Sequence, residues 1–421
     1  MSEGTVKTSI RYGGGAFDAR SALIRLYGFL QRKEVVILKS DSKLCGELLA
    51  ASDTKGTFIE HLFATPAWSP IYSVESMDGE RWEQLARDFK NVMAATGWRE
   101  RLGPLVGKYA GGLAEAARRD PSKIVDSETI ARTVVSILYE LLFSREISPE
   151  DQSLFYSASL EWRKEIAIKG KGDPEIKYRF LGRVRELVAE SPFKDGLEAY
   201  PNDPAAWLSV FAQPFLISPQ INIGDILVTV FRYLREDPAA FERARSWARA
   251  GDRARLEGVA LEAIRLRHPF PVLERELKRE FSSAGKRYAP GTQIFVMLDQ
   301  FEQDRKFDPE RWLQAPAENP YAAIPFAAGP RMCVGKPIAL ELLSGLLGEL
   351  LLEFPEDRVQ PQLGHRFSGR ENDARGTLKE ALYQLGVFAR GLRSCVGIGR
   401  RESTGCPWKK LKGKICPDEI R

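Results

Sequence analysis

Apolar residues recur at three- and four-residue intervals along most of the chain, which is the pattern of amphipathic helices. The predicted helices cover residues 21–33, 42–51, 80–95, 101–119, 127–143, 149–168, 174–190, 204–235, 238–250, 253–267 and 337–353. Strand-like patterns are short, at residues 34–39 and 292–298, while 387–396 is open to either interpretation. The pattern therefore predicts a mainly α fold with small β-sheets.

The longest predicted helix, residues 204–235, is apolar but interrupted. Asp203 and Pro204 form a good N-cap and first turn, whereas Pro214 and Pro219 each remove a backbone hydrogen bond and predict breaks. No stretch approaches the ~20 uninterrupted apolar residues of a membrane span. The first residues also lack the basic-then-apolar order of a signal peptide. We therefore expect no membrane span and a cytoplasmic location.

Composition limits the class of protein and the number of domains. The 421 residues are 43% hydrophobic and 28% charged, which excludes wholesale disorder. Length alone suggests two or three domains, but the sequence shows no internal repeat and no Pro/Gly/Ser-rich linker. We therefore predict one domain over residues 1–400, followed by a basic tail over 401–421. The net charge of +5 is too small to indicate nucleic-acid binding.

Histidine and cysteine are scarce. The three histidines are His61, His268 and His365, so a multi-histidine metal centre has few possible ligands. The five cysteines are Cys45, Cys333, Cys395, Cys406 and Cys416. An odd number spread over a long chain argues against a disulfide framework. At least one thiol therefore needs an explanation of its own.

The strongest local pattern runs from Phe326 to Gly335 and reads Phe-Ala-Ala-Gly-Pro-Arg-Met-Cys-Val-Gly. It resembles the heme-binding loop of the cytochrome P-450 (heme-thiolate) family, Phe-x-x-Gly-x-Arg-x-Cys-x-Gly, at five positions. At ~1 in 20 per position, chance gives such a match on the order of once in three million starting points. A loop around a buried structural cysteine is the alternative.

The resemblance implies the cytochrome P-450 fold, heme b as cofactor and Cys333 as the thiolate ligand of its iron. A thiolate pushes electron density onto the iron, which favours O–O cleavage. Gly335 would let backbone N–H groups approach the sulfur, and the following helix would offer its positive end. Arg331 would pair with a heme propionate, and Phe326 would pack against the ring beneath the iron.

Two further motifs precede the cysteine in the order that the family has. Glu262 and Arg265 match Glu-x-x-Arg, whose residues share one helical face and can form an ion pair. Arg311, within Phe-Asp-Pro-Glu-Arg-Trp, matches the segment whose arginine completes a buried triad. The resemblance implies a structural role for these three residues and a second propionate contact for Arg275. It covers about residues 20–400.

One departure from the family pattern lies near residue 82. The family has a Trp or His followed four residues later by an Arg, both facing a propionate. Trp82 fits as a heme contact through its indole N–H, but the residue four positions on is Ala86 and Arg87 follows one later. One residue turns a helical side chain by ~100°, so Arg87 as a solvated surface residue is an equal alternative.

The larger departure lies in the long central helix. Oxygen-activating members carry an acid–alcohol pair there, which delivers protons during oxygen activation. Counting back from Pro238 places Ile221 at the acid position and Asn222 at the alcohol position, while Thr229 falls two turns too late. The predicted catalytic candidates are Asn222 and Gln220; packing or lining of a pocket is the alternative for both. The proline at 219 resembles that of fatty-acid peroxygenases, but Ser218 replaces the arginine that anchors a carboxylate in those enzymes.

These features leave three functions open. The first is a monooxygenase-type or oxidative-coupling enzyme acting on an apolar or aromatic small molecule in secondary metabolism, with a ferredoxin or flavodoxin-type reductase partner. The second is a peroxide-dependent peroxygenase, or a hydroperoxide isomerase or dehydratase of the same fold. The third is a non-catalytic heme-binding protein. The sequence does not specify the substrate.

Overall fold

The computed structural model describes residues 19–52, 54–55, 77–120, 125–166, 172–270, 272–283, 285–298, 304, 306–315, 318–354 and 359–360. The chain divides into two compact units, one of residues 1–27 with 369–421 and one of residues 28–368. The fold below is that of the second unit, apart from helix α1, most of which belongs to the first unit. The segment 387–396, the tail 401–421, and His61, His365, Cys395, Cys406 and Cys416 lie outside the described residues.

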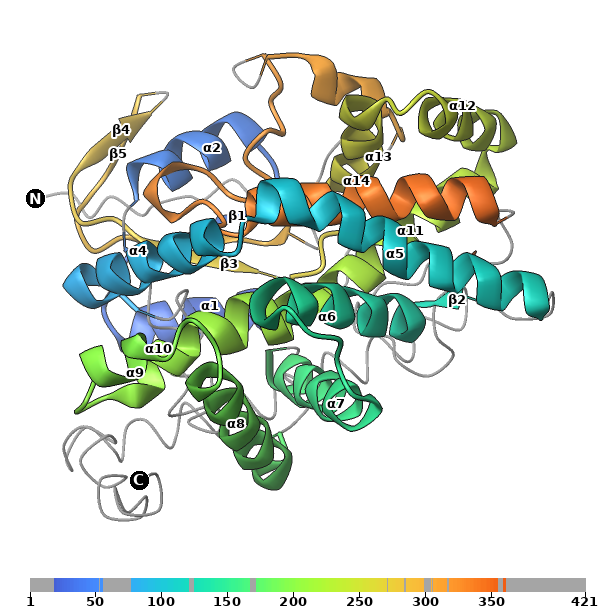
Figure 1. Ribbon diagram of the computed structural model, residues 1–421. Helices are drawn as coiled ribbons and strands as arrows, with labels where there is room; N and C mark the ends of the chain where they lie inside the picture. Colours follow the sequence, from blue (N-terminus) through green and yellow to red (C-terminus); the bar gives the residue numbers. More distant parts are fainter. Residues whose placement is uncertain are drawn as a thin grey trace, which may run out of the picture. The chain divides into compact units, whose positions relative to one another are not determined.

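Helices make up most of the described chain (Figure 1). Their bounds are α1 (Ala19–Leu30), α2 (Ser42–Ala51), α4 (Gly79–Ala95), α5 (Trp98–Arg119), α6 (Ser127–Phe143), α7 (Pro149–Ile166), α8 (Pro174–Ala189), α9 (Asp195–Ala199), α10 (Pro204–Phe211), α11 (Ser218–Glu236), α12 (Pro238–Arg249), α13 (Arg253–Leu266) and α14 (Lys336–Glu353). Aspartate caps define several starts: Asp41 accepts the Leu44 N–H at 3.0 Å, and Asp126 accepts the Thr129 N–H at 2.8 Å. The predicted mainly helical class is confirmed.

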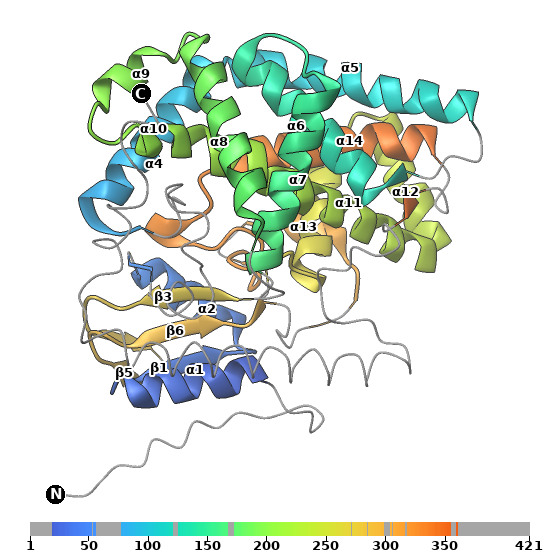
Figure 2. The ribbon, with the colours of Figure 1, turned by 90° about the horizontal axis from the view of Figure 1, so that it is seen from below.

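Short strands form small sheets. The strands are β1 (Val35–Leu38), β2 (Val125–Asp126), β3 (Leu273–Glu276), β4 (Phe281–Ser283), β5 (Lys286–Tyr288), β6 (Gln293–Val296) and β7 (Val359–Gln360). The central β6 pairs in parallel with β1 and antiparallel with β3, as Figure 2 shows, and all four of its residues are buried. Helix α2 packs on this sheet through Cys45, Leu48 and Leu49. Other pairs are β2 with β7 and β4 with β5.

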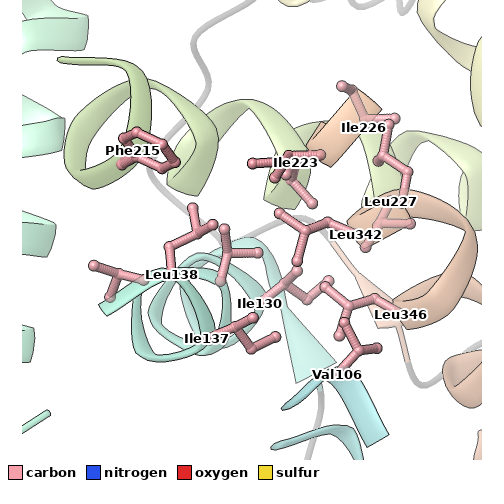
Figure 3. Packing of buried hydrophobic residues seen from close by; sticks show 14 of the residues in the cluster. Val106, Ile130, Ile137, Leu138, Phe215, Ile223, Ile226, Leu227, Leu342 and Leu346 are labelled. Atoms are coloured by element: carbon pink, nitrogen blue, oxygen red, sulfur yellow. The ribbon is translucent and has the colours of Figure 1, made fainter. Parts of the chain in front are cut away.

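The helical core is centred on α6, which is apolar on nearly all sides and packs closely against α11. A Cβ built on Gly224 of α11 would lie 2.6 Å from the Ser127 carbonyl oxygen, so glycine permits this approach. Figure 3 shows Ile130 and Leu138 of α6 facing Ile223 and Phe215, with Leu342 of α14 beside them. The core therefore joins the central helix to the helix that follows Cys333.

The long apolar segment is not one uniform helix. A π-helical stretch, η3 (Ala212–Ile217), separates α10 from α11 and contains Pro214, so the predicted break there is confirmed. Pro219 is the second residue of α11, in the first turn, where proline is tolerated. Residues Pro204–Glu236 are long and apolar enough to cross a membrane, yet 72% of the most apolar window is buried within the protein. Buried core helices pass the same test, so this is weak evidence for a span.

Candidate functional site

Cys333 lies directly before α14, on a loop fixed by backbone hydrogen bonds. The Cys333 N–H donates to the Phe326 carbonyl at 2.9 Å, and the Lys336 N–H donates to the Cys333 carbonyl at 3.2 Å. The thiol is half-buried. Gly335, the residue before α14, lies beside the sulfur, since a Cβ built there would be 4.0 Å from Sγ. The positive end of α14 is therefore next to the thiol and favours its thiolate form.

The loop is backed by α2 at Gly329. This residue has φ +71, and a Cβ on it would lie 2.7 Å from the Ala50 Cα and 2.8 Å from the Leu49 carbonyl oxygen. Glycine is therefore required there on grounds of both space and backbone conformation. The turn η6 (Gly329–Arg331) then directs the chain toward Cys333.

The predicted triad of Glu262, Arg265 and Arg311 is present; Glu262 and Arg265 have no exposed surface and Arg311 is half-buried. The Arg265 Nε and Nη2 donate to the two Glu262 carboxylate oxygens at 2.8 and 2.6 Å, and the Arg311 Nε donates to Oε1 at 3.1 Å. Glu262 also accepts the Asp308 N–H and the Trp312 indole N–H, each at 2.9 Å. These donors come from α13 and from the segment around η5 (Pro309–Leu313). The triad therefore fixes that segment against α13.

Arg331 and Arg275 lie side by side and are buried. The Arg275 Nη2 donates to the Arg331 carbonyl at 3.1 Å. The Arg331 guanidinium stacks over the Trp82 ring at 4.2 Å and forms an ion pair with Asp78, which precedes α4. Asp78 was not predicted from the sequence, because 253 residues separate it from Arg331. Buried cations need anions. Asp78 is the anion beside Arg331, and two neighbouring buried arginines also suit a ligand that carries carboxylates.

The structure gives the surroundings of three residues that the sequence analysis left open, Arg87, Asn222 and Gln220. Arg87 is exposed, as the surface alternative requires. Asn222 is half-buried; its Oδ1 accepts from the Arg163 Nη1 at 2.9 Å and its Nδ2 donates to the Ser218 Oγ at 3.1 Å. Gln220 has no exposed surface, and its Nε2 donates to the Phe155 carbonyl at 3.3 Å. Gln220 thus packs against α7, and its catalytic role stays a prediction that this geometry does not favour.

The residues present fit a heme. Within the described ranges no cluster of three or more His, Cys, Asp or Glu side chains could hold a bare metal ion. An iron that arrives in a porphyrin needs one protein ligand, and Cys333 offers a thiol next to a positive helix end. The other described cysteine, Cys45, is fully buried, and burial, with Asp41 adding to it, raises its pKa to about 12. Cys45 therefore stays a neutral core thiol, and Cys333 is the better ligand.

Comparison with solved structures identifies the fold. A solved zebrafish cytochrome P450 structure with progesterone matches this chain with a TM-score of 0.60 at 18% identity, covering 76% of this chain and 86% of that one. The cytochrome P-450 fold that the sequence resemblance implies is therefore confirmed.

Sequence comparisons match part of the chain. Residues 240–369 match the family model "Cytochrome P450". Cytochrome P450 4d2 of Drosophila melanogaster is 35% identical over 118 residues, which are 26% of this chain and 24% of that protein. Methyltetrahydroprotoberberine 14-monooxygenase of Papaver somniferum is 29% identical over 120 residues, or 25% and 23% of the two chains. Residues 240–369 thus resemble the cytochrome P450 family in sequence, and the chain spans about a quarter of the length of these curated relatives.

Proposed function

We propose that this protein is a heme-thiolate oxidoreductase in which Cys333 is the axial ligand of the iron. The observation that carries the proposal is the position of Cys333 directly before α14, with its N–H held by the Phe326 carbonyl. Heme, when bound, supplies the oxidative chemistry. The protein would supply the thiolate, the Arg331 and Arg275 guanidiniums for the propionates, and the packing of Phe326 and Trp82.

The substrate we propose is an apolar or aromatic small molecule, and the poppy relative named as a monooxygenase supports this reaction class. Electrons would come from a ferredoxin or flavodoxin-type reductase partner, or peroxide would replace both oxygen and reductant. A place in secondary metabolism and a cytoplasmic location stay predictions.

In our proposal, this protein differs from ordinary oxygen-activating relatives because it lacks the acid–alcohol pair that delivers protons. The side chain of Ile221, at the acid position, is apolar and buried. Asn222, at the alcohol position, has an amide that does not titrate and that bonds Arg163 and Ser218. We therefore expect poor ordinary hydroxylation, and better turnover with peroxide or with a substrate that supplies its own protons or undergoes coupling or desaturation.

Two measurements test the proposal. The reduced protein with carbon monoxide should show the thiolate-specific absorption band, and Cys333→Ser should abolish it while Cys45→Ser retains it. Turnover of a panel of apolar substrates is then compared with reductase plus NADPH and with hydrogen peroxide. Brisk, tightly coupled NADPH-driven hydroxylation would contradict the atypical proton supply. Absence of the thiolate band from the unmodified protein would refute the heme-thiolate assignment.

A second candidate is a hydroperoxide isomerase or dehydratase, favoured by the amide of Asn222 and the neighbouring Ser218 hydroxyl on the central helix. Rapid consumption of a lipid hydroperoxide without any reductant would support it. An unchanged rate in Asn222→Ala would remove it. A non-catalytic heme protein is the outcome if no substrate turns over under either condition while the thiolate band is present.

A further inference from the structure

His268 lies just after α13 and is nearly completely buried between two backbone segments. The Phe270 N–H donates to its Nδ1 at 3.0 Å, and its Nε2 lies 3.2 Å from the Pro325 carbonyl oxygen. A backbone N–H can only donate and a carbonyl can only accept, so Nδ1 is unprotonated and Nε2–H donates to Pro325. The Phe270 carbonyl oxygen, 3.1 Å from Nδ1, then contributes no hydrogen bond. One neutral tautomer satisfies both segments.

The acceptor of this bond is the residue at the start of the thiolate loop. Pro325 directly precedes Phe326, whose carbonyl accepts the Cys333 N–H at 2.9 Å. His268 therefore connects the turn after α13 to the segment of Pro325 and Phe326, which in turn bonds the Cys333 N–H. Burial, with the nearby Arg163 charge adding to it, lowers the pKa of His268 to about 4, so the imidazole stays neutral near pH 7.

The turn that carries His268 is itself held by α7, which in turn is bonded to the central helix. Arg163 of α7 is buried, and its Nη2 donates to the Pro269 carbonyl while its Nη1 donates to the Asn222 Oδ1 at 2.9 Å. The guanidinium also lies over the Phe270 ring at 5.4 Å. Hydrogen bonds of Arg163 and His268, joined by the backbone between residues 268 and 269, thus connect α11 to the thiolate loop.

We propose that His268 is a positioning residue for the thiolate loop and that Arg163 and Asn222 hold the turn from which it acts. A single imidazole that donates to Pro325 and accepts from Phe270 fixes the loop in one place. Loss of the donor leaves the buried Pro325 carbonyl without this partner, and the loop gains other positions. The inference rests on the proposed role of Cys333, and its readout is the fraction of heme that is thiolate-ligated.

A pair of amide variants separates the two hydrogen bonds. His268→Gln retains a donor near the Nε2 position, and His268→Asn retains an acceptor near Nδ1 but loses the donor to Pro325. We expect His268→Asn to lower the ratio of thiolate-ligated to other heme by roughly tenfold, measured in the reduced carbon-monoxide spectrum, while His268→Gln stays near wild type. Heme content and the urea midpoint are measured in parallel. Equal loss in both variants, or loss in neither, overturns the role of His268.

The proposed role of Asn222 is tested by a separate set of variants. Asn222→Ala should lower the same ratio, and the combination with His268→Asn should be less than additive, since both act through one turn. The exposed Asn91 of α4 provides the control, Asn91→Ala. Slower turnover of Asn222→Ala with an unchanged ratio overturns the link through Arg163. A missing thiolate band in the unmodified protein would instead refute the proposed function, so the two failures are distinguishable.

Discussion

Replacement of Glu262 by alanine is expected to destabilise the protein far more than loss of a surface ion pair. Glu262 has no exposed surface and accepts five hydrogen bonds, from Arg265, Arg311, Trp312 and the Asp308 backbone. Its removal leaves Arg265, also fully buried, with carbonyl acceptors but without this carboxylate. The loss is an uncompensated buried charge rather than one missing contact.

The expected magnitude follows from that comparison. Removal of one partner from a buried pair costs about 3–5 kcal/mol of unfolding free energy. Arg311→Met removes one donor to Glu262 and should cost about 1–3 kcal/mol. Glu190→Gln breaks the pair of Arg145 and Glu190, whose side chains are 46% and 57% exposed, and should cost about 0–1 kcal/mol.

Urea unfolding at constant heme content, followed by fluorescence and converted with a common slope, measures the three losses. We expect the loss of unfolding free energy to be largest for Glu262→Ala, intermediate for Arg311→Met and smallest for Glu190→Gln. If Glu262→Ala loses no more than Glu190→Gln, the triad does not hold the η5 segment and this reasoning is wrong.

Two other predictions concern packing and protonation. Gly224→Ala should destabilise the protein by about 1–3 kcal/mol, because its Cβ would lie 2.6 Å from the Ser127 carbonyl oxygen. Gly182→Ala, in open space on α8, should instead stabilise the protein by about 0.5–1 kcal/mol. Thermal unfolding of both variants measures the two changes in stability, and changes of the same sign would contradict the prediction. Burial lowers the pKa of His268 from 6.5 to about 4, so as the pH falls the unfolded chain binds a proton here before the folded protein does. The contribution of the neutral His268 to stability is therefore fully present above pH 6.5 and is lost as the pH falls toward 4. Wild type should therefore lose about 3 kcal/mol more than His268→Gln over that window in urea titrations, and parallel curves would refute the assignment.

Helices and their caps could be predicted because their signals are local. The span 127–143 was predicted to the residue, since Asp126 caps the helix and apolar residues fill nearly every position after it. The thiolate loop and the triad were predictable for another reason: they are spaced motifs of fixed residue type. Strand β3 was missed because Leu-Glu-Arg-Glu has no strand pattern, and it forms only by pairing with β6.

Long-range polar contacts could not be predicted in this way. The Asp78–Arg331 pair and the His268–Pro325 bond join residues 253 and 57 positions apart, and no local pattern marks either. Both ring nitrogens of His268 bond backbone groups, which no feature of the local sequence indicates. The π-helical stretch η3 was foreshadowed by Pro214, but two nearby prolines do not indicate which turn will widen.

The central helix gives the strongest reason to test peroxide first. An isoleucine side chain has no proton to give, and an amide does not titrate in the physiological range. In our proposal Ile221 and Asn222 stand at the acid and alcohol positions, and neither side chain can supply a proton there. The hydrogen bonds of Asn222 to Arg163 and Ser218 add that its amide is committed to holding α7 and the Pro269 turn. A co-substrate that brings both the oxygen and the protons removes the need for such a pair, and hydrogen peroxide is the simplest molecule that does so.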